Sequence, residues 1–209
     1  MSRKIVFASH NMGKFVEMQN MLKYYNIELI MQAEFGVESI EETGLSFIEN
    51  AILKARHAAA VTGLESLADD SGLEVDFLQG APGIYSARYA GYDADFSANM
   101  KKLLINMQPA TNRSARFVCV LALVNSAKDA TPKIYSGFWS GLIATDLSGN
   151  QGFGYDPVFY YPPLKKTFAQ MSLEDKNRVS HRGKAMGELR GEFDKVLIWL
   201  KHRLTEEPP

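Results

Sequence analysis

The stretch LESLADDSGL, residues 64–73, sets two neighbouring aspartates, Asp69 and Asp70, directly after an apolar run. We expect residues 64–68 and 73–77 to form strands that flank an acidic turn, so that the first strand delivers both carboxylates into it. Adjacent carboxylates at a strand end repel each other unless a cation, a donor or a proton compensates, and Mg²⁺ takes carboxylate oxygens readily. The segment therefore indicates an enzyme that acts on phosphates, although Asp-Asp-Ser-Gly is also the composition of an ordinary polar turn.

Along the rest of the chain, apolar residues recur at strand and helix periods in mixed order. Strands are expected at residues 4–8, 27–31, 116–124, 133–139, 142–145 and 157–161. Helices are expected over 15–25, from the capping box at 46–49 to Gly63, over 96–107 and over 185–200. The last helix has the clearest apolar face, formed by Ala185, Leu189, Phe193, Val196 and Leu200. With no repeat or linker, this order predicts one α/β domain over residues 1–209 with a partly antiparallel sheet.

Composition narrows the class of protein. The chain has 209 residues and a net charge of -1, from 23 Lys and Arg against 24 Asp and Glu. No overall basic field is present to hold a nucleic acid backbone. The single cysteine, Cys119, lies in an apolar run and is expected to be buried, which excludes a disulfide within the chain. We find no signal peptide or membrane span, and expect a reducing, cytoplasmic protein without a membrane or nucleic acid partner.

Six residues separate the first expected strand from the first helix: Ser9, His10, Asn11, Met12, Gly13 and Lys14. Backbone N–H groups at such a helix N-terminus face a bound anion, and Lys14 would add a full positive charge. The spacing is not that of a Walker loop, and strand-to-helix loops with one lysine are common. This segment is therefore a candidate anion-binding loop.

Two further segments of the first half carry polar side chains that fit a phosphate or metal site. Asn50, Lys54 and His57 fall on one face of the second expected helix, a pattern that is also typical of a solvated face. Upstream, Glu41 and Glu42 lie in a loop, and a loop carboxylate can complete a Mg²⁺ site. Loops rich in glutamate are also common without any ligand.

In the second half, residues 152–157 combine glycines with two aromatics and an acid. A base could stack on Phe153 or Tyr155, and Asp156 could accept its N–H groups, with Gly154 allowing a close approach; a tight turn with core aromatics has the same composition. Residues 180–184 precede the last helix, and with Lys176 they form a cationic cluster in an expected loop. His181 and Arg182 could donate to a carbonyl or phosphate oxygen, although cations at a helix end are common.

Motifs of several other enzyme classes are absent from the sequence. It contains no Gly-x-Ser-x-Gly elbow, no His-Glu-x-x-His, no Cys-x-x-Cys and no dinucleotide Gly-x-Gly-x-x-Gly. Serine hydrolase, zincin, zinc-ribbon and Rossmann oxidoreductase classes therefore lose their main support.

Taken together and in this order, the segments resemble the inosine/xanthosine triphosphate pyrophosphatase family, which hydrolyses deaminated purine nucleoside triphosphates. The resemblance covers nearly the whole chain. It is carried by residues 9–14, 41–44 with Phe47, 50–51 and 54–55, 68–73, 82–88, 152–157 and 180–185. One departure lies in the first loop, where the family often has Thr-Gly-Asn and this chain has Ser9-His10-Asn11. Serine keeps the hydroxyl, but His10 replaces a glycine that would let backbone approach a phosphate closely.

The resemblance implies a fold, a metal and an assembly. The fold is two-lobed, with a long mixed sheet flanked by helices and a substrate cleft between the lobes, and the protein is a homodimer. The cofactor is Mg²⁺, with Asp70 as catalytic acid and metal ligand and Glu41 as the second acid; Glu42 remains an alternative to Glu41.

The resemblance also assigns the nucleotide contacts. Residues 9–14 and Ser71 contact the triphosphate and the sugar side. The purine is held by Phe153, Gly154, Tyr155, Asp156, Lys176, His181 and Arg182.

The implied reaction is attack of water at the α-phosphorus of a purine nucleoside triphosphate, which releases pyrophosphate and a monophosphate. Asp70, with Asp69 adjacent, would orient or deprotonate the water. Lys14 and Lys54 would neutralise charge on the departing pyrophosphate.

Two other classes use similar residues. A non-catalytic nucleotide-binding module would have the same loops without needing paired acids at a strand end. A metal-dependent nuclease is disfavoured by the near-zero net charge.

Overall fold

A computed structural model describes residues 2–91, 95–192, 195–196 and 198 of the chain. Within these residues seven strands form a sheet in the order β2-β1-β3-β4-β5-β6-β7. β1 pairs in parallel with β2 and β3, whereas β6 is antiparallel to both β5 and β7. The strands are β1 Arg3–Phe7, β2 Ile27–Met31, β3 Ser66–Val75, β4 Ser114–Val124, β5 Lys133–Ile143, β6 Phe159–Tyr161 and β7 Lys166–Thr167. The predicted α/β fold with a mixed, partly antiparallel sheet is confirmed.

Five α-helices accompany the sheet in the described part of the chain. They are α1 Met12–Leu22, α2 Phe47–Thr62, α3 Phe96–Asn106, α4 Leu173–Val179 and α5 His181–Gly191. Short 3₁₀ helices lie at Gln32–Phe35, Asp76–Leu78, Gly83–Arg88, Pro162–Leu164 and Phe168–Gln170. No helix of the described residues is long and apolar enough to cross a membrane.

The residues group into two compact units. The first unit comprises Met1–Asp70, Val120–Ser136 and Lys184–Pro209, and the second comprises Ser71–Cys119 and Gly137–Gly183. Strands β3, β4 and β5 contribute residues to both units.

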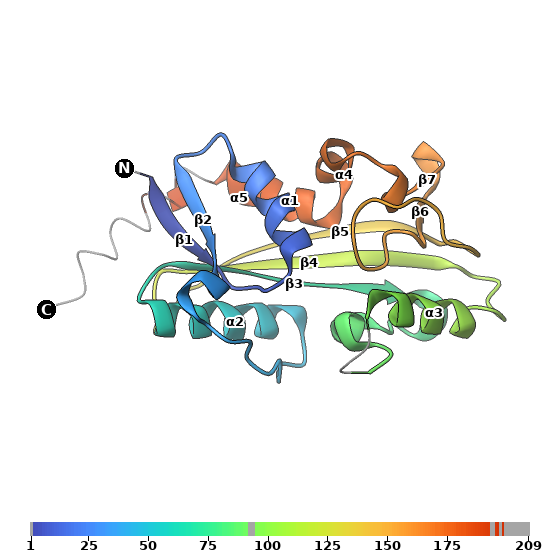
Figure 1. The fold of residues 1–209 in the computed structure, drawn as a ribbon, viewed down its shortest axis with the longest axis horizontal. Helices are drawn as coiled ribbons and strands as arrows, with labels where there is room; N and C mark the ends of the chain where they lie inside the picture. The colour runs from blue at the N-terminus through green and yellow to red at the C-terminus, as the bar shows by residue number, and fades with distance from the viewer. Residues whose placement is uncertain (1, 92–94, 193–194, 197, 199–209) are drawn as a thin grey trace, which may run out of the picture. The chain divides into compact units, whose positions relative to one another are not determined.

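In the first unit, α1 and α2 lie on opposite faces of β1 and β2 (Figure 1). Both helices begin at a side-chain cap, because Asn11 accepts the backbone N–H of Lys14 at 3.0 Å and Ser46 accepts that of Glu49 at 3.2 Å. α2 ends at Gly63, whose φ of 67° is a left-handed conformation that glycine adopts without strain. The predicted start and end of this helix are confirmed.

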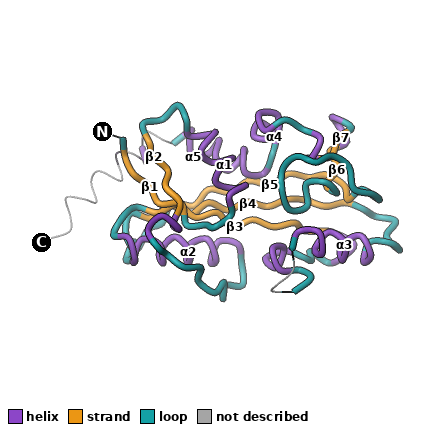
Figure 2. The backbone as a smooth tube through the Cα atoms, viewed as in Figure 1, coloured by secondary structure: helices purple, strands orange, loops and turns teal. Residues whose placement is uncertain are grey.

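In the second unit, α3 and α4 lie on opposite faces of the strands (Figure 2). Its core is aromatic: the Phe117 ring centroid lies 4.5 Å from that of Phe159 and 5.7 Å from that of Phe168. Leu73 of β3 and Leu103 of α3 are fully buried against this cluster. The core is thus built around β4 and fixes the elements on both sides of it.

The prediction of two strands flanking an acidic turn is wrong, because β3 runs unbroken through Ser66–Val75. Asp69 and Asp70 lie in the middle of this strand and are only 1% and 6% exposed. A turn would have left both carboxylates in water. The strand continues because lysines from two helices compensate the buried charges, a tertiary effect that overrides the local preference of Asp for turns.

The two strands expected at 133–139 and 142–145 likewise form one strand, β5. Gly141 lies between the two expected segments and is part of this strand. A Cβ at this position would come within 2.6 Å of the backbone oxygen of Tyr160 in the neighbouring β6. The glycine therefore permits close strand pairing instead of ending the strand.

The end of the chain differs from prediction in two ways. Residues 173–179 form α4, which was not expected, so Lys176 lies in a helix and not in a loop. α5 begins at His181, four residues earlier than the predicted helix. The signal for α4 is present at Ser172, whose side chain accepts the backbone N–H of Asp175 at 3.1 Å. Of the predicted apolar face of the last helix, Phe193 and Leu200 lie outside the described residues.

Candidate functional site

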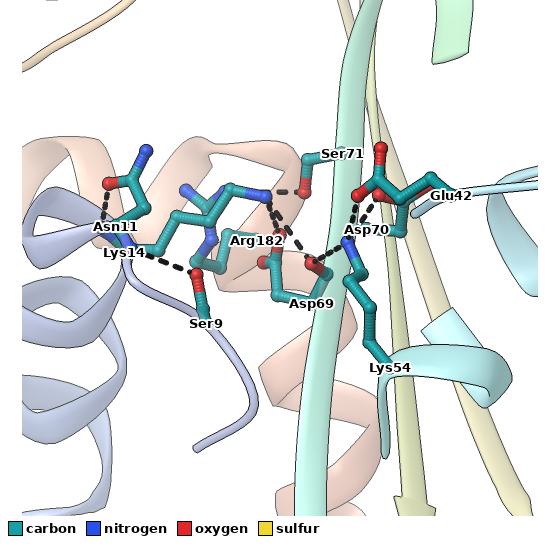
Figure 3. Close-up of polar contacts among 9 residues, drawn as sticks. All are labelled: Ser9, Asn11, Lys14, Glu42, Lys54, Asp69, Asp70, Ser71 and Arg182. Carbon is teal, nitrogen blue, oxygen red and sulfur yellow. Dashed lines mark hydrogen bonds and ion pairs between the residues drawn. The ribbon is translucent and has the colours of Figure 1, made fainter. Parts of the chain in front are cut away.

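The two neighbouring aspartates of β3 meet different lysines. Successive side chains of a strand point to opposite faces of the sheet, and α1 and α2 lie on opposite faces of the first unit. Accordingly the Asp69 carboxylate pairs with Lys14 of α1 at 2.6 Å, and the Asp70 carboxylate pairs with Lys54 of α2 at 2.6 Å (Figure 3). Asp69 and Asp70 therefore do not form one paired-carboxylate site. Each is the centre of its own charged cluster.

A second carboxylate joins the cluster around Asp70. The Lys54 ammonium donates to Oε1 of Glu42 at 2.8 Å, to Oδ1 of Asp70 at 2.6 Å and to the backbone oxygen of Asp69 at 3.1 Å (Figure 3). The other oxygen of Asp70, Oδ2, is buried and has no hydrogen-bond partner among the described residues. Glu42 and Asp70 are therefore held together by one shared cation, with an acceptor oxygen of Asp70 left over.

The charges of this cluster shift its proton affinities. Burial raises the pKa of the Asp70 carboxyl; Lys54 and Lys14 lower it in part, Glu42 raises it, and the net pKa is above the ordinary value. Burial lowers the pKa of Lys54, but the carboxylates of Asp70 and Glu42 outweigh burial and raise the net pKa. Lys54 is therefore a stable cation, and Asp70 is a better proton acceptor than a free aspartate.

The loop that carries Glu42 is fixed to the start of α2. The backbone N–H of Gly44 donates to the side chain of Asn50 at 2.8 Å, and that of Leu45 donates to Glu49 at 2.6 Å. Asn50 is fully buried, so it does not belong to a solvated face. Gly44 has no room for a side chain, because a Cβ there would come within 2.6 Å of the Asn50 oxygen.

Of the two loop acids, Glu42 is the one beside Asp70. Glu41 is exposed, whereas Glu42 is half-buried and contacts Lys54. Sequence alone could not decide between these two neighbouring glutamates, because the choice depends on which side chain meets Lys54 in the folded chain.

The first loop presents a helix N-terminus with a lysine beside it. Ser9 Oγ accepts the backbone N–H of Asn11 at 3.1 Å, and Asn11 caps α1. Met12 and His10 are exposed, and Gly13 is half-buried. Lys14 reaches from the first turn of α1 to Asp69 (Figure 3). The arrangement fits an anion, since the N-terminal end of a helix and an ammonium both attract negative charge.

The second unit gathers two cations around one aromatic ring. Lys176 lies over the ring of Phe153, with Nζ 4.7 Å from the centroid, and the Arg182 guanidinium carbon lies 5.7 Å from it. Lys176 is fixed by a buried ion pair with Asp156 at 2.5 Å, and Asp156 also accepts the backbone N–H of Phe153 at 2.9 Å. Gly152 is required beside them, because a Cβ there would overlap the Asp156 carboxylate. The segment is thus a rigid platform with a half-buried ring.

Three other residues expected at the purine take up defined places in the second unit. Tyr155 is 5% exposed and packs in the core, where its hydroxyl donates to the backbone oxygen of Ser86 at 2.8 Å; burial raises its pKa. His181 stacks on Phe117, with centroids 4.7 Å apart. Arg182 is 1% exposed and donates to Ser71 Oγ at 3.2 Å (Figure 3). Of the two aromatic residues Phe153 and Tyr155, only Phe153 has a half-buried side chain that a ligand could contact.

The donor set of the first unit fits a hard divalent cation. No group of three or more His, Cys, Asp or Glu side chains that could hold a metal occurs within the described ranges. Asp70 and Glu42 nevertheless supply two carboxylates, and the buried Oδ2 of Asp70 is an acceptor without a donor there. Mg²⁺ is commonly bound by one or two carboxylates together with waters and substrate phosphates.

Comparison with known proteins identifies the family. The model of the Ham1 family matches residues 5–192. This chain belongs to the Ham1 family. A Ham1 protein of Coxiella burnetii has a structure that matches with a TM-score of 0.85 at 46% identity, over 92% of this chain and 99% of that one. The Ham1 protein of Staphylococcus aureus matches with a TM-score of 0.81 at 43% identity, over 92% and 99% of the two chains.

Two curated relatives of this Ham1 protein are named dITP/XTP pyrophosphatase. The dITP/XTP pyrophosphatase of Yersinia pestis is 55% identical over 186 residues, which is 88% of this chain and 94% of the relative. The dITP/XTP pyrophosphatase of Escherichia coli K12 is 51% identical over 186 residues, with the same coverage.

Sequence reasoning overlooked Gly44 and Asn50 as the residues that fix the acidic loop. A Gly44→Ala substitution is expected to lower the free energy of unfolding by about 1–3 kcal/mol, because the added methyl overlaps Asn50 and must displace the loop. Gly187→Ala is the matched control, since a Cβ at this helical glycine meets no atom within 4 Å. Urea denaturation measures both, and a Gly44→Ala protein as stable as the unsubstituted one would contradict the tight packing of this loop.

Proposed function

We propose that this Ham1 protein hydrolyses deaminated purine nucleoside triphosphates, ITP, dITP and XTP, to the monophosphate and pyrophosphate. The observation that carries the proposal is the cluster of Glu42, Lys54 and Asp70 in the first unit, in which two carboxylates share one ammonium. The lysine-bearing N-terminus of α1 in the same unit supports the binding of a polyanion. Curated relatives of similar length are dITP/XTP pyrophosphatases, which supports the choice of substrate.

Asp70 and Glu42 would hold a divalent cation, which we propose to be Mg²⁺. Bound there, the ion would supply a positive charge to phosphate oxygens and polarise the phosphorus toward attack. The resemblance assigned Glu41, but the contact between Glu42 and Lys54 favours Glu42. Glu41 is exposed and is proposed as a matched control.

In the proposed reaction, Asp70 accepts a proton from the water that attacks the α-phosphorus. Oδ2 of Asp70 accepts no hydrogen bond from the described residues and is the oxygen proposed to accept this proton. Lys14 and Lys54 stabilise the charge of the departing pyrophosphate, together with the N-terminus of α1 and residues 9–13.

The second unit is proposed to hold the purine. The Phe153 ring offers a stacking surface, and Lys176, His181 and Arg182 offer donors to the oxygen that hypoxanthine and xanthine carry at position 6. Adenine carries an amino group there, which would leave the donors without an acceptor. Ser71, bound to Arg182, would contact the sugar side.

Assembly and location are proposed from the family resemblance. The protein would act as a homodimer in the cytoplasm, on a free nucleotide and without a nucleic acid or membrane partner. The net charge of -1 favours a small substrate over a nucleic acid backbone.

A substrate panel tests the proposed activity. ITP, dITP and XTP are expected to give pyrophosphate in a Mg²⁺-dependent reaction, whereas ATP and GTP are expected to react much more slowly. Asp70→Asn should lower turnover by about 10²–10⁴-fold with a smaller effect on KM, the contribution typical of a general base. Quantification of pyrophosphate and orthophosphate gives the readout. Orthophosphate as the first product would refute the proposed bond cleavage, and unchanged turnover of Asp70→Asn would refute the role of Asp70.

The assignment of the second carboxylate has its own test. Glu42→Gln is expected to raise the Mg²⁺ concentration for half-maximal activity by about tenfold or more, because one of two ligand charges is lost. Glu41→Gln should change it by less than about twofold, because this side chain is exposed. Mg²⁺ titrations at saturating ITP measure both, and the reverse order of effects would assign the ligand to Glu41.

Discrimination between purines tests the residues of the second unit. His181→Ala and Arg182→Ala are each expected to narrow the ratio of kcat/KM between ITP and ATP by about tenfold or more, because a donor to the position 6 oxygen is lost. The ratio is measured within each variant, so loss of folded protein cancels from it. Arg190→Ala on the exposed side of α5 should leave the ratio unchanged. If both variants kept the original ratio, the proposed role of His181 and Arg182 in purine recognition would be wrong.

A further inference from the structure

Lys54 places its ammonium between the two carboxylates of the first unit's acidic cluster. Its ammonium is surrounded by three oxygen atoms, Oε1 of Glu42 at 2.8 Å, Oδ1 of Asp70 at 2.6 Å and the backbone oxygen of Asp69 at 3.1 Å (Figure 3). The two shorter contacts, to the carboxylate oxygens, are charge-assisted hydrogen bonds. The side chain of Lys54 is 16% exposed, so water does little to screen these contacts.

The same two carboxylates are the ones that fit a divalent cation. Mg²⁺ requires oxygens at about 2.0–2.1 Å in near-octahedral geometry. An ammonium that donates to both Glu42 and Asp70 already compensates one of their two negative charges and would repel a second cation brought to the same oxygens. Lys54 and a divalent cation are therefore competitors for this cluster.

We propose that Lys54 is a resident counter-cation, which holds the carboxylates of Glu42 and Asp70 together and leaves them when a divalent cation binds. This inference rests on the proposed function, because it takes Glu42 and Asp70 as the metal-binding residues. Lys54 weakens metal binding as long as its ammonium has no other partner. A triphosphate provides that partner, so nucleotide and metal each improve the binding of the other.

Lys14 shows why the inference is specific to Lys54. Its ammonium also pairs with an aspartate, at 2.6 Å, but that aspartate is Asp69, which points away from Asp70 along β3. Substitution of Lys14 removes a nearby positive charge without releasing Glu42 or Asp70. Substitution of Lys14 therefore reports the effect of removing one positive charge, whereas substitution of Lys54 also frees the carboxylates of Glu42 and Asp70.

The test measures Mn²⁺ binding to the nucleotide-free protein, with electron paramagnetic resonance to count free Mn²⁺. Lys54→Met is expected to bind Mn²⁺ at least about tenfold more tightly than the unsubstituted protein, because the competing charge is gone. Lys14→Met should change the affinity by less than about threefold. Glu42→Gln should bind more weakly than the unsubstituted protein, because it loses a ligand.

Thermal unfolding gives a second readout that is independent of activity. Metal-free Lys54→Met should unfold at a lower temperature, because its carboxylates have lost their cation, and Mn²⁺ should raise its Tm more than it raises that of the unsubstituted protein. Lys54→Gln, which is neutral but keeps a hydrogen-bond donor, is the alternative variant if Lys54→Met does not fold. It should show the same increase in Mn²⁺ affinity.

The possible outcomes separate this inference from the proposed function. Equal or weaker Mn²⁺ binding by the folded Lys54 variant would overturn the counter-cation role, even where the unsubstituted protein hydrolyses ITP. An equal gain in affinity for Lys14→Met would also overturn it, since the effect would then be one of net charge. Tighter Mn²⁺ binding with no hydrolysis of ITP would leave the inference standing and remove the proposed activity.

Discussion

The structure of the first unit depends on compensation of two buried carboxylates in one strand. An ionised carboxylate removed from water without a partner costs several kcal/mol, so Asp69 and Asp70 are tolerable in β3 only with cations beside them. Because the strand alternates, the cations must arrive from opposite faces. Lys14 of α1 and Lys54 of α2 meet this requirement. The positions of both helices relative to β3 are therefore tied to the chemistry of the site.

This constraint explains where sequence reasoning failed for the fold. The order of elements and the mixed sheet could be predicted, because apolar periodicity and caps such as Ser46 and Gly63 are local signals. The unbroken β3 could not, since Asp-Asp-Ser-Gly is a turn by local preference and becomes a strand only through partners that are distant in sequence. The continuity of β5 through Gly141 likewise depends on a partner outside the segment, because a side chain there would overlap the neighbouring strand β6.

Much of the candidate site could be predicted as residue types, but not as contacts. Lys54 was one of three polar residues on a helix face, and only the fold places it against Asp70. The choice between Glu41 and Glu42 depends on which of the two neighbouring side chains meets Lys54, for which sequence offers no signal. Tyr155 was predicted as a ligand contact from the composition of its segment. Its ring packs in the core instead, and its hydroxyl donates to the backbone oxygen of Ser86 within the second unit.

Each unit contains an ion pair of low exposure that forms without any ligand, Lys54 with Asp70 in the first and Lys176 with Asp156 in the second. In the second unit the Asp156 carboxylate fixes the Lys176 ammonium over the Phe153 ring, which removes the entropy cost of placing a flexible lysine at that ring. In the first unit the Lys54 ammonium holds two carboxylates that would otherwise repel each other. The two ion pairs differ in what a ligand must do. In the proposed function a purine would use Lys176 where it stands, whereas in the proposed exchange a divalent cation would displace Lys54. On these proposals, fixed charge would favour recognition in one unit, and exchangeable charge would couple metal to nucleotide in the other.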